Sequence, residues 1–221
     1  MSLFLTGTDT GVGKTYTAVC LLRLARAAGM RSAGMKPICC GDRKDAELLL
    51  AASSDGLTID QVNPVWLKTP VAPFSAALIE DVVIQPEQLV RGLEVLRARF
   101  DFVVVEGVGG WLVPIRQDYF VADLARDMAL PVLVVALNRL GCLNHTLLTA
   151  RSITASGLVC AGVALNAAKQ MTDFSSATNE EILRRTSDVP ILPGLSAEMT
   201  KFPGEWRPMA GLKPNTKPSL D

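Results

Sequence analysis

Histidine is almost absent from this chain, because its 221 residues include only His145. A zinc site built from several histidines is therefore excluded, and any histidine-based catalytic triad has to use this one residue. Net charge is also lacking, since 22 Lys and Arg balance 22 Asp and Glu. A protein that binds nucleic acid without sequence preference normally carries a basic excess. The composition argues against a nucleic-acid partner.

Cysteine pairs and long apolar runs are scarce as well. The five cysteines are odd in number and none are spaced as Cys-x-x-Cys, a pattern typical of a reduced, cytoplasmic protein. The N-terminal sequence MSLFLTGTDTG has no basic segment and no long apolar stretch, which argues against a signal peptide. The longest strongly apolar run, residues 130–137, is too short to cross a bilayer. We expect a cytoplasmic protein without a membrane partner.

Apolar residues in short runs are plentiful, at 49% of the chain, which suits one domain over residues 1–221. Valine- and leucine-rich runs alternate with helical patterns, which predicts a mostly parallel central sheet in a three-layer α/β/α fold. Prolines at 203, 208, 214 and 218 predict an irregular C-terminal tail over residues 201–221. Strands are expected at residues 3–6, 32–35, 102–105, 132–136, 159–165 and 191–192, and helices at residues 15–28, 45–52, 86–100, 122–128, 144–156 and 179–185.

The most specific segment is Gly-Thr-Asp-Thr-Gly-Val-Gly-Lys-Thr at residues 7–15, between a predicted strand and a predicted helix. Backbone N–H groups and the helix N-terminus in such a loop wrap a polyphosphate. Lys14 would reach the β- and γ-phosphates, and the Thr15 hydroxyl would bind Mg²⁺. The common pattern has glycine six residues before the lysine, where this chain has Thr8, so the loop is one residue longer. The alternative is a glycine-rich turn that only caps a helix.

A carboxylate follows another predicted strand. Glu106 stands where residues 102–105 end, and it would hold Mg²⁺ directly or through water. Gly107, Gly109 and Gly110 come next and allow the backbone to approach a ligand closely. The alternative for Glu106 is a solvated acid at a strand end.

Further motifs follow one another along the chain. They are Ala33-Gly-Met-Lys36-Pro37, Asp45-Ala46, Asn63-Pro64, Pro70-x-x-Pro73, Val105-Glu-Gly-Val-Gly-Gly-Trp111, Leu130-Pro-Val132, Leu140-Gly-Cys-Leu-Asn-His145 and Asn166. Together with residues 7–15, these motifs make the chain resemble the dethiobiotin synthetases of the biotin pathway over roughly residues 3–195. The longer phosphate loop is itself a trait of that family. The resemblance implies a P-loop NTPase-type fold.

The resemblance also implies an ATP- and Mg²⁺-dependent ring closure. One amine of 7,8-diaminononanoate takes up CO₂ as a carbamate, ATP phosphorylates the carbamate to a mixed anhydride, and the second amine closes the cyclic urea. The implied partners are the diamine, CO₂ or bicarbonate, ATP and a second copy of the chain. In the family the block at residues 140–145 reaches the diamine of the neighbouring subunit, which implies a homodimer with sites near the interface.

Individual residues take their roles from this resemblance. The implied catalytic residues are Lys36, Lys14 and Thr10, and the implied magnesium ligands are Thr15, Asp45 and Glu106. The implied substrate contacts are Lys36, Cys40, Gly109 and Asn144. The implied nucleotide contacts are Gly11, Val12, Gly13, Lys14, Thr15, Tyr16, Asp45, Glu106, Gly107, Val108, Gly109, Asn166 and Ala167, with Asn166 on the adenine.

On their own, several of these residues have plainer interpretations. Lys36 alone would be a solvated lysine, Asp45 an acid at a helix start, and Asn166 a turn residue. His145 is expected to start a helix or to pack at the interface and not to act as a general base.

The chain departs from the family at three places. Gly11 stands where some members have glutamate, and Cys40 replaces a serine that contacts substrate, although a thiol is a weak hydrogen-bond partner. Residues 193–198 match the adenine-lining loop only loosely, so base selectivity stays open.

Three other functions remain as alternatives. An ATP-dependent ligase of the cobyrinate-amidating type normally carries an amidotransferase domain, for which 221 residues leave no room. A partition or septum-positioning ATPase carries an extra lysine at the start of the loop, where this chain has Thr8 and Asp9. A nucleotide-binding paralogue without turnover would be expected to lose residues such as Lys14, Lys36, Asp45 and Glu106.

Overall fold

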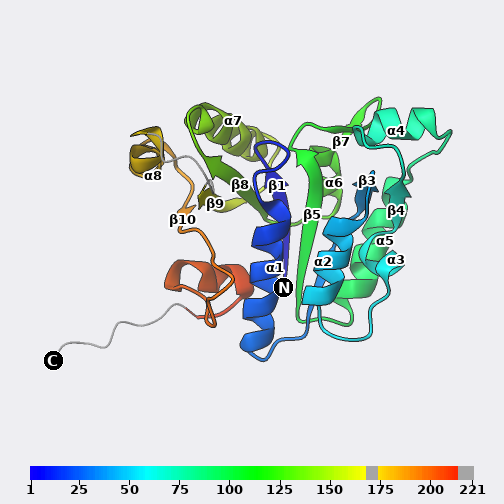
Figure 1. The fold of residues 1–221 in the computed structure, drawn as a ribbon, viewed down its shortest axis with the longest axis horizontal. Helices are drawn as coiled ribbons and strands as arrows, with labels where there is room; N and C mark the ends of the chain where they lie inside the picture. The colour runs from blue at the N-terminus through cyan, green and yellow to red at the C-terminus, as the bar shows by residue number, and fades with distance from the viewer. Residues whose placement is uncertain (168–173, 214–221) are drawn as a thin grey trace.

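The computed structural model describes residues 1–167 and 174–213, and its centre is a six-stranded sheet in the order β10-β9-β8-β1-β5-β2 (Figure 1). Every neighbouring pair in this sheet is parallel, as predicted. The strands are β1 (Ser2–Gly7), β2 (Ser32–Met35), β5 (Phe102–Gly110), β8 (Val132–Asn138), β9 (Cys160–Ala167) and β10 (Ile191–Leu192).

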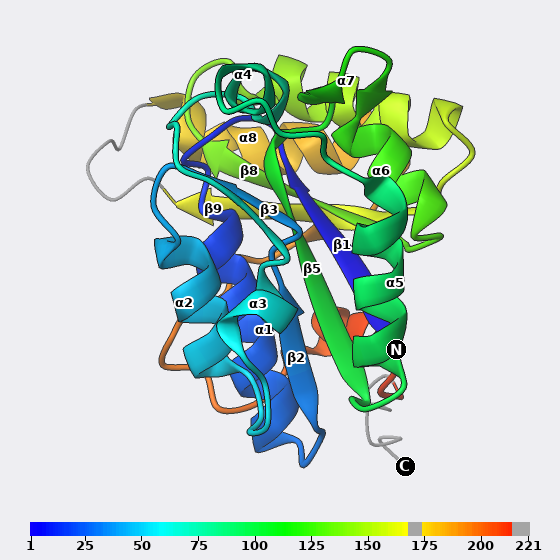
Figure 2. The same ribbon diagram turned by 90° about the vertical axis from the view of Figure 1, so that its right-hand side faces the viewer.

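Helices cover both faces of the sheet, with α1 and α2 on one side and α5 and α6 on the other (Figure 2). Among the described residues, none of the helices combines the length and apolar character needed to span a membrane. The helices are α1 (Lys14–Ala27), α2 (Lys44–Ala52), α3 (Ile59–Val62), α4 (Pro73–Ile79), α5 (Pro86–Arg97), α6 (Val121–Asp127), α7 (Cys142–Ala155) and α8 (Phe174–Thr186).

The core consists of two apolar clusters separated by the sheet. Leu3 and Leu5 pack with residues of α1 and α2, whereas Phe4, Val103 and Val105 pack with residues of α5, α6 and α7. This division follows from the strand geometry, because successive side chains point to opposite faces. The predicted three-layer α/β/α fold is confirmed.

Several short elements were not predicted. They form a parallel ribbon of β3 (Ile38–Cys40) and β4 (Val65–Leu67), an antiparallel ribbon of β6 (Pro114–Arg116) and β7 (Tyr119–Phe120), and the short helices α3 and α4. Elements of two to seven residues are too short for hydrophobic periodicity to reveal them. Helix α7 also begins at Cys142, two residues before the expected start, because Gly141 takes the N-cap position with φ 89°.

The expectation of an irregular tail is wrong for residues 204–210, which form a 3₁₀ helix, Gly204–Ala210. Trp206 is fully buried there, and its indole N–H donates to the Pro193 carbonyl at 2.9 Å. Phe202 and Leu195 join the same apolar cluster as α1. Pro208 prevents an α-helix but permits a short 3₁₀ segment, and burial of the tryptophan holds that segment against the domain. Residues 214–221 of the predicted tail lie outside the described residues.

We predict that Trp206→Ala lowers the free energy of unfolding by about 3–5 kcal/mol, because it empties a fully buried aromatic site. Urea unfolding followed by circular dichroism measures the change. Trp66→Ala serves as the control, since this tryptophan is 44% exposed and should cost less than half as much. A loss below about 1 kcal/mol for Trp206→Ala would show that the C-terminal segment is not part of the core.

Candidate active site

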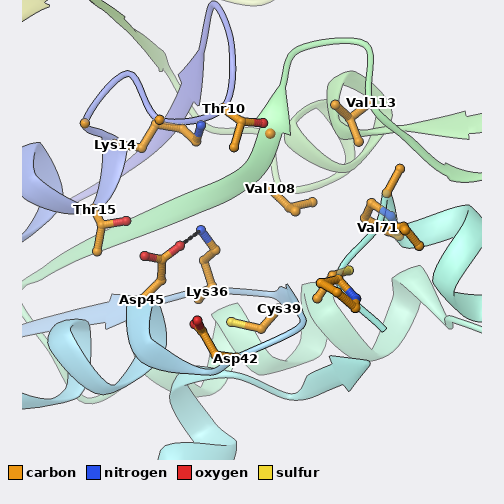
Figure 3. Close-up of a pocket in the computed structure, with 17 residues that line it drawn as sticks. Thr10, Lys14, Thr15, Lys36, Cys39, Asp42, Asp45, Val71, Val108 and Val113 are labelled. Atoms are coloured by element: carbon orange, nitrogen blue, oxygen red, sulfur yellow. Dashed lines mark hydrogen bonds and ion pairs between the residues drawn. The ribbon is translucent and has the colours of Figure 1, made fainter. Parts of the chain in front are cut away.

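Most of the predicted site residues come together at the carboxyl ends of the parallel strands, where ligands bind in sheets of this kind (Figure 3). The phosphate loop follows β1, Glu106 lies in β5, and Lys36 follows β2. Asp45 is in the first turn of α2. Together these elements border a cleft of about 680 Å³, lined by Thr10, Gly11, Gly13, Lys14, Thr15, Lys36, Cys39, Cys40, Asp42, Asp45, Pro70, Val71, Ala72, Pro73, Val108, Gly109 and Val113.

The phosphate loop needs glycine at defined positions. Gly13 is the N-cap of α1 and has φ 92°, a left-handed conformation that favours glycine. A Cβ at Gly7 would lie 2.8 Å from the Lys14 Nζ and 2.7 Å from the Asp9 carbonyl oxygen. The ammonium of Lys14 donates to that carbonyl at 2.9 Å, across the mouth of the loop. Burial and the nearby Lys36 lower the pKa of Lys14 to about 8.

An ion cluster lies beside the phosphate loop. The buried Lys36 Nζ donates to Glu106 Oε1 at 2.6 Å and to Asp45 Oδ2 at 2.9 Å, and the Thr15 hydroxyl donates to the same Glu106 oxygen at 2.8 Å. Burial acts to lower the pKa of Lys36, but the two carboxylates outweigh burial and raise it. Burial acts to raise the pKa of Asp45, but the nearby Lys36 outweighs burial, so the pKa of Asp45 is lowered. Lys36 is therefore a fixed positive charge.

Asn63 holds the backbone around Lys36, a role that the sequence motif Asn63-Pro64 did not reveal. Its side-chain amide donates to the carbonyl oxygens of Lys36 and Val65, each at 2.8 Å, and its oxygen accepts from Arg43 Nε at 2.9 Å. The Lys36 N–H donates to the Val62 carbonyl at 2.7 Å. These bonds fix the peptide groups on both sides of Lys36, so its side chain enters the cleft in one direction.

The oxygen atoms around Lys36 fit a magnesium ion. Glu106 Oε2 is buried and has no hydrogen-bond partner in the described part of the structure, and the Thr15 hydroxyl and the Asp45 carboxylate lie close by. Residues 1–167 and 174–213 contain no group of three or more His, Cys, Asp and Glu that would hold a metal alone. Mg²⁺ usually takes only one or two carboxylates and completes its shell with water and phosphate oxygens. The residues present therefore suit a magnesium ion that binds together with a phosphate.

The far end of the cleft is apolar. Val71 and Val113 lie there, away from the two lysines (Figure 3), and Cys40 also lines the cleft. Burial raises the pKa of the Cys40 thiol to about 11, so this thiol stays protonated near neutral pH. Such a thiol is a poor nucleophile. Sequence reasoning missed the valines and Pro70–Pro73 as cleft residues, because only the packing of α4 brings them here.

Seven predicted site residues do not line the cleft, namely Val12, Tyr16, Glu106, Gly107, Asn144, Asn166 and Ala167, although the buried Glu106 contacts Lys36 and Thr15, which do. The hydroxyl of Tyr16 accepts from the Ala197 N–H at 3.1 Å, which ties α1 to the segment after β10. Asn144 is exposed on α7. The amide of Asn166 faces the phosphate loop and donates to the Val12 carbonyl oxygen at 3.0 Å.

Comparison with solved structures shows the fold. A septum site-determining protein MinD complexed with Mg-ADP from Pyrococcus horikoshii has a TM-score of 0.54 at 17% identity, over 86% of this chain and 79% of the other. A ParA family ATPase from Chlorobium tepidum has a TM-score of 0.52 at 11% identity, over 90% of this chain and 86% of the other. The fold is therefore the P-loop NTPase-type fold that the resemblance implied. At these identities the likeness concerns the fold alone.

Comparison of sequences is more specific. A family model described as an AAA domain matches residues 1–198. The chain is 44% identical over 191 residues to the ATP-dependent dethiobiotin synthetase BioD of Akkermansia muciniphila, covering 86% of this chain and 90% of that protein. It is 46% identical over 197 residues to the protein of the same name from Aromatoleum aromaticum, covering 86% and 87%. The chain therefore belongs to the family of the ATP-dependent dethiobiotin synthetases.

Proposed function

We propose that this protein is an ATP-dependent dethiobiotin synthetase, a cyclo-ligase that makes dethiobiotin, ADP and phosphate from 7,8-diaminononanoate, CO₂ and ATP. The observation that carries the proposal is the buried Lys36, held by Glu106 and Asp45 in the same cleft as the phosphate loop. Phosphoryl transfer depends mainly on positioning and on stabilising negative charge. The cleft supplies a fixed cation and a phosphate cradle for both tasks.

The phosphates of ATP bind along the loop. Backbone N–H groups of Gly11 and Gly13 and the N-terminus of α1 would hold the β- and γ-phosphates, with Thr10 beside them. The Lys14 ammonium leaves the Asp9 carbonyl and pairs with the γ-phosphate. Thr15, Asp45 and Glu106 would hold Mg²⁺, which neutralises phosphate charge when bound.

The substrate supplies its own nucleophiles. One amine forms a C–N bond to CO₂ and loses a proton, which gives a carbamate. A carbamate oxygen then attacks the γ-phosphorus while the bond to ADP breaks. The second amine attacks the carbonyl carbon, the C–O bond to phosphate breaks, and the amine proton passes to phosphate or solvent. Lys36 stabilises the negative oxygens in these steps and does not exchange a proton, because its pKa is raised.

The diamine occupies the part of the cleft beyond Lys36. Its aliphatic chain packs against Val71, Ala72 and Val113, which form the apolar end of the cleft. Cys40 and Gly109 border the position of the reacting amines. Cys40 contributes shape and a weak hydrogen bond there, since its thiol stays protonated.

A homodimer completes the site. Asn144 is exposed and does not line the cleft of its own chain, so it would contact a diamine only in a neighbouring subunit. A second hollow of about 370 Å³ lies beside the loop residues Thr8, Asp9 and Thr10, with the exposed Leu112 and Leu148 on its wall. Apolar side chains exposed around a hollow are typical of an interface with a partner.

The cytoplasm is the proposed location. Cys20, Cys39, Cys40 and Cys160 are free thiols, as expected in a reducing compartment. ATP and Mg²⁺ are available there as substrate and cofactor.

We predict that the purified protein, given diaminononanoate, bicarbonate, Mg²⁺ and ATP, forms dethiobiotin and one ADP per dethiobiotin. Liquid chromatography with mass spectrometry measures the product, and omission of the diamine is the control. Hydrolysis of ATP at the same rate with and without the diamine would contradict the synthetase and favour a nucleotide-switched binding protein of the MinD and ParA kind.

Magnesium dependence tests the role of Asp45. EDTA should abolish turnover, and Asp45→Asn should raise the Mg²⁺ concentration for half-maximal rate about tenfold or more, because a neutral amide binds the ion more weakly. Glu47→Gln is the matched control, since Glu47 is an exposed acid on the same helix. Equal magnesium requirements for the two variants would remove Asp45 from the metal site.

The lowered pKa of Lys14 predicts that nucleotide binding takes up a proton. Near pH 8.5 more than half of the free protein carries a neutral Lys14, whose pKa is about 8, and bound phosphates favour the ammonium form. ATP affinity should therefore fall as the pH rises above 8. Calorimetry in two buffers of different ionisation enthalpy measures the uptake, and Lys14→Gln is the control without it. Binding by the unsubstituted protein without proton uptake at pH 8.5 would contradict this assignment.

The dimer is tested by sedimentation velocity. We expect a dimer at micromolar concentration, and Leu148→Glu should convert it to monomers with a large loss of turnover, because a charge replaces an exposed apolar contact. Val95→Glu is the control, since Val95 is exposed on α5, on a different helix. A fully active monomer would exclude the shared site.

A further inference from the structure

The side chain of Asn166 contacts the phosphate loop, and so it is not directed only at the nucleotide base. Asn166 is 8% exposed near the end of β9, and its amide nitrogen lies 3.0 Å from the Val12 carbonyl oxygen, 3.4 Å from the Gly13 carbonyl oxygen and 3.2 Å from the Thr17 hydroxyl. All three acceptors belong to the end of the phosphate loop and the first turn of α1. The side chain thus connects β9 to a loop that lies 154 residues earlier in the chain.

These contacts control the direction of the loop N–H groups. The C=O of Val12 shares a peptide plane with the N–H of Gly13, and the C=O of Gly13 shares one with the N–H of Lys14. In a trans peptide the two groups point in opposite directions. Asn166 binds the Val12 carbonyl and shares the Gly13 carbonyl with the Thr17 N–H, which donates to it at 2.9 Å. The N–H groups of Gly13 and Lys14 therefore point away from Asn166. Gly13 and Lys14 both line the cleft.

Gly13 leaves room for this amide because it has no side chain. A Cβ at Gly13 would lie 2.5 Å from Asn166 Nδ2, closer than side-chain atoms approach one another. The left-handed φ of 92° at the same residue turns the loop into α1. The fully buried Thr17, in the first turn of α1, offers its hydroxyl as an acceptor. Gly13, the Asn166 amide and the Thr17 hydroxyl therefore pack against one another where the loop enters α1.

We propose that Asn166 is a positioning residue that sets the phosphate-binding geometry of the loop through Val12, Gly13 and Thr17. The proposal deepens the ATP-dependent function and adds to any contact that Asn166 makes with the base. Under this proposal Asn166 affects how tightly the phosphates bind. A contact with the base alone would leave phosphate binding unchanged.

The test uses a ligand without a base. Calorimetry measures the affinity of the full chain for Mg-tripolyphosphate and for MgATP. Asn166→Ala should weaken both by a similar factor, of the order of tenfold, because two to three hydrogen bonds to the loop are lost. Thr17→Val keeps the side-chain shape and the backbone hydrogen bond from the Thr17 N–H to the Gly13 carbonyl. It should weaken both about threefold, because it removes the hydroxyl that accepts from Asn166.

Two further variants keep the test decisive. Asn166→Asp retains the size of the side chain but sets a carboxylate against two carbonyl oxygens. It should weaken the affinity for tripolyphosphate at least as much as Asn166→Ala does. It replaces the alanine variant in the test if that variant does not fold. Asn138→Ala is the control, because Asn138 ends the neighbouring strand β8 and donates to the Ser176 carbonyl, on α8. It should leave both affinities unchanged.

Unchanged tripolyphosphate affinity in the Asn166 variants would overturn the proposal, whether or not ATP binding weakens. Equal losses in Asn138→Ala would overturn it too, because the effect would then be general to strand ends. These measurements need no diamine, so a failure to form dethiobiotin would contradict the proposed function and leave this result standing.

Discussion

The site depends on one interaction, the buried ion cluster in which Lys36 contacts Glu106 and Asp45. Removing a lysine and a glutamate from water costs several kcal/mol for each ion, and their attraction offsets this cost only with good geometry and further hydrogen bonds. The Thr15 hydroxyl on Glu106 and the Asn63 amide on the Lys36 backbone supply those bonds. The result is a positive charge that is fixed in place beside the phosphate loop.

Strand order explains why these groups meet. In the sheet β5 lies between β1 and β2, so the phosphate loop after β1, Glu106 on β5 and Lys36 after β2 emerge side by side at one edge. The same edge continues through β8 to β9, whose Asn166 holds the other flank of the loop. The phosphate loop is thus supported by β5 on one side and by β9 on the other. A parallel sheet brings these groups to one edge because the carboxyl ends of its strands all lie there.

The sequence predicts the parts of the molecule that have strong local signals. Buried strands such as residues 102–105 and the glycine-rich loop at residues 7–15 have distinctive patterns, so the sheet, the phosphate loop and Glu106 were predictable. Lys36 and Asp45 needed the family resemblance, because a single lysine or aspartate carries little information. The contacts of Asn166 and the burial of Trp206 were not predictable, since each depends on residues distant in the chain or on a segment too short to show periodicity.

The most direct measurement asks whether the buried ion pair serves chemistry or stability. The double variant Lys36→Met/Glu106→Gln replaces both charges with neutral groups of similar volume. It should unfold with a free energy within about 1–2 kcal/mol of the unsubstituted protein, because replacing a buried pair as a whole is often neutral. Its rate of dethiobiotin formation should fall by about 10³ or more, since the fixed cation is gone. A double variant that is several kcal/mol less stable and yet turns over at a similar rate would contradict the catalytic role of the pair.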